Sequence, residues 1–125
     1  MGETILLVED EAGVREIAHL ALQREGYRIM EAADAESALA IAASSPLDID
    51  LLLSDIVMPG ESGRQLADKL KSRVKGGRVL LMTGYTEDPS ASAYPVIRKP
   101  FTPRALVEKV REILDRAESD ARIPW

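Results

Sequence analysis

Residues 5–11 read Ile5-Leu6-Leu7-Val8-Glu9-Asp10-Glu11, four hydrophobic residues followed at once by three acidic ones. A short run that is hydrophobic at every position is typical of a strand covered on both faces, because a strand with one solvated face would alternate. A similar run occurs at residues 79–82, and another at Ile49 through Leu53 is interrupted only by Asp50. Weaker strand candidates lie at Tyr27 to Met30 and at residues 96–97. These five runs predict a sheet that is buried on both sides.

Helical spacing of hydrophobic residues separates the predicted strands. The four stripes are Val14, Ile17, Ala18, Ala21 and Leu22; Ala35, Ala38, Leu39 and Ala42; Leu66, Ala67, Leu70 and Val74; and Leu106, Val107, Val110, Ile113 and Leu114. Asp34 and Thr102 stand where N-caps are expected. Residues 84–95 contain two prolines and almost no helical stripe, which predicts a shortened or irregular fourth helix. The alternation predicts an α/β fold, a doubly wound parallel sheet of five strands.

The composition indicates one folded domain. The chain has 125 residues, of which 46% are hydrophobic and 30% charged, and this balance is typical of a single globular domain. We expect the domain to span residues 3–116, with 117–125 forming a flexible C-terminal tail or the start of a linker. The formal net charge of -5 and the lack of a block of consecutive basic residues argue against direct nucleic-acid binding.

The same residues limit the cellular location and the chemistry. Cysteine is absent, which excludes disulfides, thiolate metal sites and cysteine nucleophiles. The N-terminus lacks the pattern of a signal peptide, and no apolar run approaches the roughly 18 residues that cross a bilayer. We therefore expect a cytoplasmic protein without membrane insertion.

Acidic and basic residues follow the predicted strands at their carboxyl ends. Glu9 and Asp10 follow the first strand, Asp55 follows the third and Lys99 follows the fifth. In a sheet of strand order 2-1-3-4-5, these ends lie side by side at the edge where open α/β sheets bind ligands. Clustered carboxylates repel one another unless they share a proton or a cation, and Mg²⁺ suits a shallow site of carboxylate oxygens. Asp10, and Glu9 directly or through water, are the predicted Mg²⁺ ligands.

The carboxylate that ends the central strand is the candidate for a reaction with phosphorus. Asp55 is predicted to bind the metal and to attack a phosphoryl group as an ionised oxygen that needs no general base. The backbone carbonyl of Val57 is a further expected metal ligand. Thr83, after the fourth strand, can donate its hydroxyl hydrogen to a phosphoryl oxygen, and Lys99 can pair with another. The pattern predicts phosphoryl transfer to Asp55.

Four segments resemble the receiver domain of two-component response regulators. In the order that the family has them, they are Ile5-Leu6-Leu7-Val8-Glu9-Asp10-Glu11, Ser54-Asp55-Ile56-Val57-Met58-Pro59-Gly60, Met82-Thr83-Gly84-Tyr85 and Lys99-Pro100-Phe101-Thr102. The resemblance covers about residues 3–116 and is greatest to receivers attached to hybrid histidine kinases. It implies a flavodoxin-like fold, and a phosphoacceptor signalling domain in place of an enzyme.

The resemblance also implies a partner and a switch. The phosphoryl donor is expected to be a phosphohistidine of a sensor histidine kinase or of a phosphotransfer protein, and the reaction is expected to need Mg²⁺. Thr83 is expected to carry the conformational switch, and the Lys99-Pro100 bond is expected to be cis. Val96 stands three residues before Lys99, where many receivers have Tyr or Phe, so an aromatic switch at that position is absent from this chain. Tyr85 and Tyr94 are the aromatic residues that could replace it.

Two other functions are open to a chain with this site. The first is a Mg²⁺-dependent phosphatase that works through an aspartyl-phosphate, but the second Asp that such enzymes need would stand at the position of Val57. The second is a pseudo-receiver, a binding module that docks partners without being phosphorylated. The complete set of site residues argues against the pseudo-receiver.

Overall fold

Five parallel strands form one sheet in the order β2-β1-β3-β4-β5, as predicted. The computed structural model describes residues 2–45, 48–84 and 93–122, without the side chains of 117–122. The strands are β1 (Thr4–Val8), β2 (Arg28–Ala32), β3 (Leu51–Asp55), β4 (Val79–Thr83) and β5 (Val96–Arg98), and the helices are α1 (Ala12–Gln23), α2 (Ala35–Ser44), α3 (Gly63–Leu70) and α4 (Pro103–Arg122). Two short 3₁₀ turns, Lys71–Arg73 and Lys75–Gly77, join α3 to β4.

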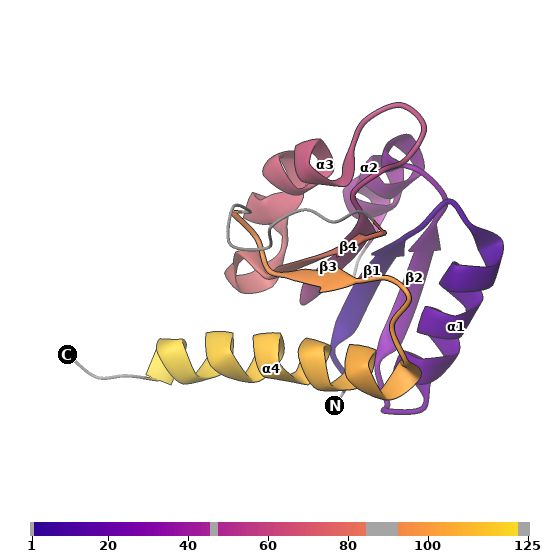
Figure 1. The fold of residues 1–125 in the computed structure, drawn as a ribbon. Helices are drawn as coiled ribbons and strands as arrows, with labels where there is room; N and C mark the ends of the chain where they lie inside the picture. Colours follow the sequence, from indigo (N-terminus) through magenta and orange to yellow (C-terminus); the bar gives the residue numbers. More distant parts are fainter. Residues whose placement is uncertain (1, 46–47, 85–92, 123–125) are drawn as a thin grey trace.

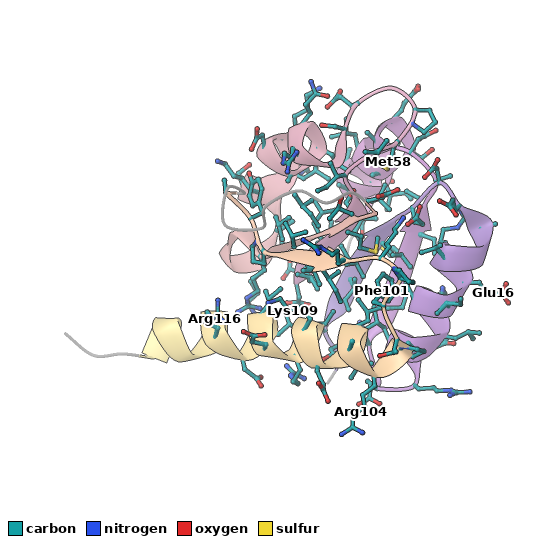
Figure 2. All side chains as sticks on the ribbon, in the orientation of Figure 1. Glu16, Met58, Phe101, Arg104, Lys109 and Arg116 are labelled. Atoms are coloured by element: carbon teal, nitrogen blue, oxygen red, sulfur yellow. The ribbon has the colours of Figure 1, made fainter. Side chains whose placement is uncertain are left out.

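Helices cover both faces of the sheet (Figure 1). Because successive side chains of a strand point to opposite faces, β1 and β3 each supply two cores. Leu6, Val8 and Leu52 belong to the core under α2 and α3, whereas Ile5, Leu7 and Leu53 belong to the core under α1 and α4. Charged side chains such as Glu16 and Arg104 point away from these cores (Figure 2). The predicted doubly wound α/β fold is therefore confirmed.

The helix starts follow the predicted capping residues. The Asp34 carboxylate accepts a hydrogen bond from the backbone N–H of Ser37 at 2.8 Å. The Thr102 hydroxyl accepts one from the backbone N–H of Ala105 at 3.0 Å, and Pro103 begins α4. Helices α2 and α4 thus begin where a side-chain oxygen accepts a hydrogen bond from a backbone N–H group that has no partner within the helix.

Several predicted boundaries were wrong by about two residues. Strand β2 was predicted at Tyr27 to Met30 but lies at Arg28–Ala32, and β3 was predicted from Ile49 but begins at Leu51. Tyr27 is buried just before β2, and Ile49 pairs with Val74 in an isolated bridge. Both positions were assigned to strands because they are hydrophobic, and hydrophobicity reports burial, which extends beyond the hydrogen-bonded ladder.

Two members of the predicted helical stripes also differ from expectation. Ile17 is 50% exposed, although the pattern predicted it on the buried face of α1. The buried stripe of α1 is narrower and consists of Ala18, Ala21 and Leu22. Val74 is buried, as expected, but it lies beyond the end of α3, between the two 3₁₀ turns.

The remaining expectations on the fold concern the end of the chain and residues 84–95. The shortened or irregular helix that was predicted between β4 and β5 falls mainly on residues 85–92, which lie outside the described residues. Helix α4 continues to Arg122, past the expected start of a tail at residue 117. Among the described residues, no helix combines the length and the hydrophobicity needed to cross a membrane.

Candidate functional site

The predicted site residues converge at the carboxyl edge of the sheet. Residue pairing brings the strand ends into line, with Val8 beside Ser54, Asp55 beside Met82 and Thr83 beside Arg98. Glu9 follows β1 directly, Asp55 is the last residue of β3, and Lys99 follows β5. Residues that are far apart in the sequence thus share one edge, as the strand order predicted.

The Lys99 ammonium lies between two carboxylates. Its Nζ is 2.6 Å from Oε1 of Glu9 and 3.2 Å from Oδ2 of Asp55. Glu9 is fully buried, Asp55 and Thr83 are buried, and the Lys99 side chain is only 16% exposed. A charge taken out of water is costly without a partner, so the ionised forms of Glu9 and Asp55 depend on Lys99 at this edge.

A third carboxylate completes the acidic cluster. Glu9, Asp10 and Asp55 each offer one oxygen, and these oxygens all lie within 4.8 Å of one another. Asp10 is exposed, which leaves the cluster open to solvent on one side. Three carboxylates and one lysine carry a formal charge of -2, the amount that one divalent cation neutralises. The donor set consists of carboxylate oxygens, which Mg²⁺ prefers, so the site fits the predicted ion.

Burial and crowding dominate the electrostatics of this cluster. Burial, together with the charge of Asp55, raises the pKa of Glu9 to about 7, although Lys99 acts against the shift. Burial likewise raises the pKa of Asp55 against the influence of Lys99. Burial opposes the charged form of Lys99, but its contacts with Glu9 and Asp55 raise its pKa overall. One lysine does not compensate for three carboxylates, so the cluster favours an additional cation.

Hydrogen bonds to backbone groups hold Glu9 and Lys99 in position. The backbone N–H of Glu11 donates to Oε2 of Glu9 at 3.2 Å, and Nη1 of Arg15 donates to the Glu9 carbonyl at 2.8 Å. The backbone N–H of Lys99 donates to the Thr83 carbonyl at 2.7 Å, and the Lys99-Pro100 bond is cis, as the family resemblance implied. The contribution of Arg15 was not predicted, because a charged residue on a helix reads as solvated when only the sequence is considered.

Two further predicted site residues lie at or just beyond the carboxyl ends of β3 and β4. Thr83 ends β4 next to Met82, the pairing partner of Asp55. Val57 follows Asp55 by two residues and is 51% exposed. Its carbonyl remains a predicted ligand. Of the two tyrosines considered for a switch, Tyr85 lies outside the described residues. Tyr94 donates its hydroxyl hydrogen to Asp68 of α3.

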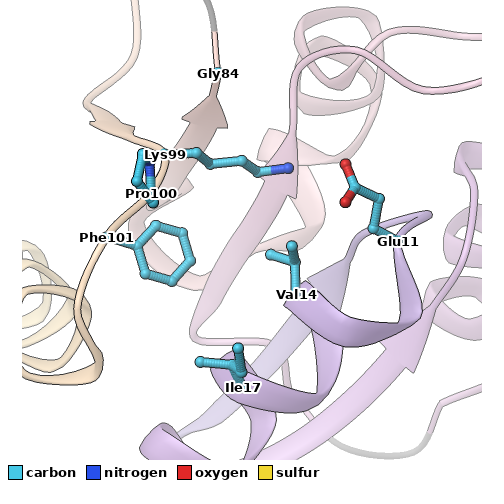
Figure 3. Close-up of a pocket in the computed structure, with 7 residues that line it drawn as sticks. All are labelled: Glu11, Val14, Ile17, Gly84, Lys99, Pro100 and Phe101. Atoms are coloured by element: carbon cyan, nitrogen blue, oxygen red, sulfur yellow. The ribbon is translucent and has the colours of Figure 1, made fainter.

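A pocket of about 420 Å³ opens beside Lys99. It lies between the start of α1 and the segment that joins β5 to α4. Its lining residues are Glu11, Val14, Ile17, Gly84, Lys99, Pro100 and Phe101. In Figure 3 the Lys99 and Glu11 side chains point toward each other at one end, and Val14, Ile17 and Phe101 form an apolar wall below them. The exposed Ile17 is therefore part of a surface that adjoins the acidic cluster.

Known proteins match this chain along most of its length. The family model of the response regulator receiver domain matches residues 5–111. The sensor kinase CckA of Brucella abortus is 34% identical over 121 residues, covering 92% of this chain and 13% of that protein. The phosphate regulon transcriptional regulatory protein PhoB of Pseudomonas aeruginosa is 35% identical over 124 residues, covering 93% of this chain and 53% of that protein. The chain thus spans at most about half the length of these relatives.

Solved structures agree in fold and extent. The receiver domain of the hybrid histidine kinase CckA has a TM-score of 0.77 and 37% identity, covering 89% of this chain and 98% of that chain. A CheY-like receiver domain protein from Methanospirillum hungatei has a TM-score of 0.82 and 31% identity, covering 96% and 99%. The relatives include both a hybrid kinase and a transcriptional regulator. The flavodoxin-like sheet, the acidic cluster and the match over residues 5–111 together mean that this chain belongs to the response regulator receiver domain family of two-component signalling, a family of phosphoacceptors.

Proposed function

We propose that Asp55 accepts a phosphoryl group from a phosphohistidine of a sensor histidine kinase or of a phosphotransfer protein. The observation that carries the proposal is the Lys99 ammonium, which contacts Oδ2 of Asp55 at 3.2 Å within a cluster of three carboxylates. Asp55 Oδ attacks phosphorus and forms an O–P bond, while the P–N bond breaks and its electron pair stays on the imidazole. An ionised carboxylate serves as nucleophile without a base.

The cluster would hold Mg²⁺ through Glu9, Asp10, Asp55 and the Val57 carbonyl, with Glu9 acting directly or through water. The bound ion supplies positive charge that offsets the charge of the phosphoryl oxygens. Lys99 pairs with one phosphoryl oxygen once Asp55 is modified, and Thr83 donates its hydroxyl hydrogen to another. These new bonds shift the loops at the sheet edge toward a second arrangement, and the affinity for a partner changes with them.

The pocket beside Lys99 supports a macromolecular donor. Its apolar wall of Val14, Ile17 and Phe101 adjoins Lys99 and Glu11, so a protein that packs there brings its phosphohistidine to the acidic cluster. An exposed, contiguous apolar surface is typical of a docking site. The occupant that we propose is the surface of the donor protein around its phosphohistidine, because the wall is continuous with the acceptor site.

The receiver unit that we propose comprises residues 3–116, and the chain from residue 117, where α4 continues to Arg122, is proposed to be a tail or the start of a linker. The proposal also includes a cytoplasmic location. The proposal concerns the receiver domain alone and not the activity of a whole protein, because this chain spans 13% of one relative and 53% of another.

Incubation with acetyl phosphate and Mg²⁺ tests the central step. Intact-mass spectrometry is expected to find one added phosphoryl group on the wild type and none on Asp55→Asn. A wild type that gains no phosphoryl group under these conditions, yet binds Mg²⁺, would identify a pseudo-receiver and contradict the proposal. Turnover of a generic phosphoester would support the phosphatase alternative.

A second experiment tests the macromolecular donor. A panel of purified phosphorylated histidine kinases is screened, and one that transfers to the wild type is kept as the donor. Ile17→Ser is expected to slow transfer from that kinase about tenfold, the scale of an interface anchor, and to leave the rate with acetyl phosphate unchanged. Leu20→Ser is the matched control, because Leu20 is 49% exposed on α1 but does not line the pocket, and its loss should be smaller. Equal losses from both variants would contradict the assignment of the pocket.

A further inference from the structure

The backbone of Asp55 is in unusually close contact with the first residue of α3. A Cβ atom on Gly63 would lie 2.1 Å from the Asp55 carbonyl oxygen, 2.9 Å from the Asp55 carbonyl carbon and 3.0 Å from Cα of Ile56. Gly63 does not have a positive φ, so the glycine is not required by its own backbone conformation. It is required by space, because all three contacted atoms are backbone atoms that cannot rotate away.

A second residue binds the same carbonyl oxygen. The Ser54 hydroxyl, which is fully buried, donates to the Asp55 carbonyl at 3.0 Å. The peptide that follows is also held, because the backbone N–H of Ile56 donates to the Met82 carbonyl at 2.9 Å and that of Gly63 donates to the Ile56 carbonyl at 2.8 Å. The backbone at Asp55 and Ile56 is therefore fixed by β4, by Ser54 and by the start of α3.

The start of helix α3 is fixed by a capping box, so its contact with the Asp55 backbone is fixed as well. Ser62 and Gln65 form a reciprocal capping box, in which the Ser62 hydroxyl accepts from the backbone N–H of Gln65 and the Gln65 side chain accepts from that of Ser62. Such a cap fixes the first turn of a helix. The Asp55 backbone thus rests against an anchored helix terminus.

We infer that Gly63 and Ser54 are positioning residues for phosphorylation, and that they set the place of the Asp55 carboxylate relative to Lys99 and the metal ligands. The inference rests on the proposed function of Asp55. A methyl group at Gly63 displaces the backbone from Asp55 to Ile56, and Val57, whose carbonyl is the proposed metal ligand, follows directly. Both the nucleophile and one ligand therefore move, and misplacement of about 1 Å can slow a reaction about 100-fold.

The test compares Gly63→Ala with Gly13→Ala. Gly13 lies in the first turn of α1, has no positive φ, and a Cβ added there meets nothing within 4 Å, so the same substitution is made in the same kind of location without the contact. Three quantities are measured in the intact chain: the melting temperature, the rate of Asp55 phosphorylation by acetyl phosphate at saturating Mg²⁺, and the ¹³C chemical shift of the Asp55 carboxyl carbon.

Gly63→Ala is expected to lower the phosphorylation rate about 100-fold at a temperature where the variant is fully folded, and to move the Asp55 carboxyl shift. Gly13→Ala is expected to change neither quantity. Ser54→Ala, which removes the hydroxyl without adding an atom, should lower the rate about tenfold and move the same signal. A purely structural role would lower the melting temperature and leave the rate and the shift of the folded protein unchanged, and that result would overturn the inference.

The two proposals fail in distinguishable ways. If the wild type takes up no phosphoryl group, the proposed function fails, and the Asp55 carboxyl shift in Gly63→Ala still decides the positioning role. If the wild type is phosphorylated and Gly63→Ala reacts at the same rate with an unchanged shift, only the positioning role fails. If Gly63→Ala does not fold, Ser54→Ala gives the decision by the same rate and shift.

Discussion

Two groups of charged residues lie at opposite ends of β1. The protein lowers the pKa of the glutamate at one end and raises the pKa of the glutamate at the other. Glu3, just before the strand, pairs with Arg111 at 3.0 Å. Burial acts against its ionised form, but hydrogen bonds, including one from Arg111, lower the pKa of Glu3 to about 2. Glu9, just after the strand, pairs with Lys99 at 2.6 Å, yet its burial raises its pKa to about 7. A short ion pair alone therefore does not indicate which end is functional.

Burial and charge balance account for the difference. Glu3 retains partial exposure to water, and Arg111 also pairs with Asp115 at 3.1 Å, so cation and carboxylates stabilise one another on the surface. Glu9 is fully buried and shares its lysine with Asp55, with Asp10 close by. An excess of buried negative charge destabilises the folded state until a cation binds, which is a common property of functional sites.

The largest difference should come from Mg²⁺ itself. At a concentration 100 times its dissociation constant, an ion that binds only the folded state adds about 2.7 kcal/mol to the free energy of unfolding. We expect this gain in the wild type and a much smaller one in Asp10→Asn, while Glu3→Gln should retain the full gain because Glu3 is at the other end of β1. Urea unfolding with and without Mg²⁺ measures all three, and an equal gain in Asp10→Asn would contradict the metal site.

The next largest difference should come from removal of the cationic side chain at each end of β1, Lys99 or Arg111. Without Mg²⁺, Lys99→Ala leaves buried carboxylates unpaired, and we expect a loss of about 2 kcal/mol, below the range for a fully enclosed pair because Asp10 is open to water. Arg111→Ala should cost about 1 kcal/mol, from a screened ion pair and from the cation–π contact with Tyr27 at 5.7 Å. The ranking is checked by urea unfolding at neutral pH. Mg²⁺ should offset part of the Lys99→Ala loss and none of the Arg111→Ala loss.

Neutralisation of one carboxylate at each end should give effects of opposite sign. Asp55→Asn removes one negative charge from the crowded cluster, so without Mg²⁺ it should raise the free energy of unfolding by about 1 kcal/mol. Glu3→Gln removes a favourable partner of Arg111 and should lower it by about 1 kcal/mol. The same unfolding experiment measures both. A stability loss in Asp55→Asn would mean that the cluster is already balanced without a metal.

The alternation of buried strands and helices followed from local patterns of the sequence, and the strand order came from the family resemblance, whereas the positions within the site came from neither. Uninterrupted hydrophobic runs such as Ile5 to Val8 predicted buried strands, and the acids after them predicted the functional edge. The boundary errors at Tyr27 and Ile49 arose because hydrophobicity marks burial and not hydrogen bonding. The exposure of Ile17 was missed because helical spacing defines a face but not the width of the part that is covered.

The contacts that hold Asp55 were outside the reach of sequence patterns. Gly63 is needed because α3 approaches the Asp55 carbonyl, a contact between segments that only the fold brings together. Sequence patterns also do not predict the contact of Arg15, whose guanidinium donates to the Glu9 carbonyl from helix α1. Residue type predicted the chemistry of the site, and tertiary packing determines its geometry.

The last predicted effect concerns pH and is specific to the amino-terminal end of β1. Because the pKa of Glu3 is lowered from its ordinary 4.5 to about 2, its ionised form stabilises the folded state, fully so above pH 4.5. That contribution is lost as the pH falls from 4.5 toward 2, since the carboxylate then becomes protonated in the folded state as well. The difference in free energy of unfolding between the wild type and Glu3→Gln should therefore shrink across this interval.

The double comparison isolates Glu3, because the carboxylates at the other end of β1 titrate equally in both proteins and cancel. Gln resembles a protonated Glu, so the two curves should meet near pH 2 and separate by about 1 kcal/mol at neutral pH, a modest amount for a partly exposed pair. Arg111→Ala provides the control, because Arg111 supplies one of the hydrogen bonds that lower the pKa of Glu3, so Glu3→Gln made in that background should show a smaller separation at neutral pH. A separation that stays constant with pH would mean that Glu3 acts through packing and not through charge, and the contrast between the two ends of β1 would then rest on the site cluster alone.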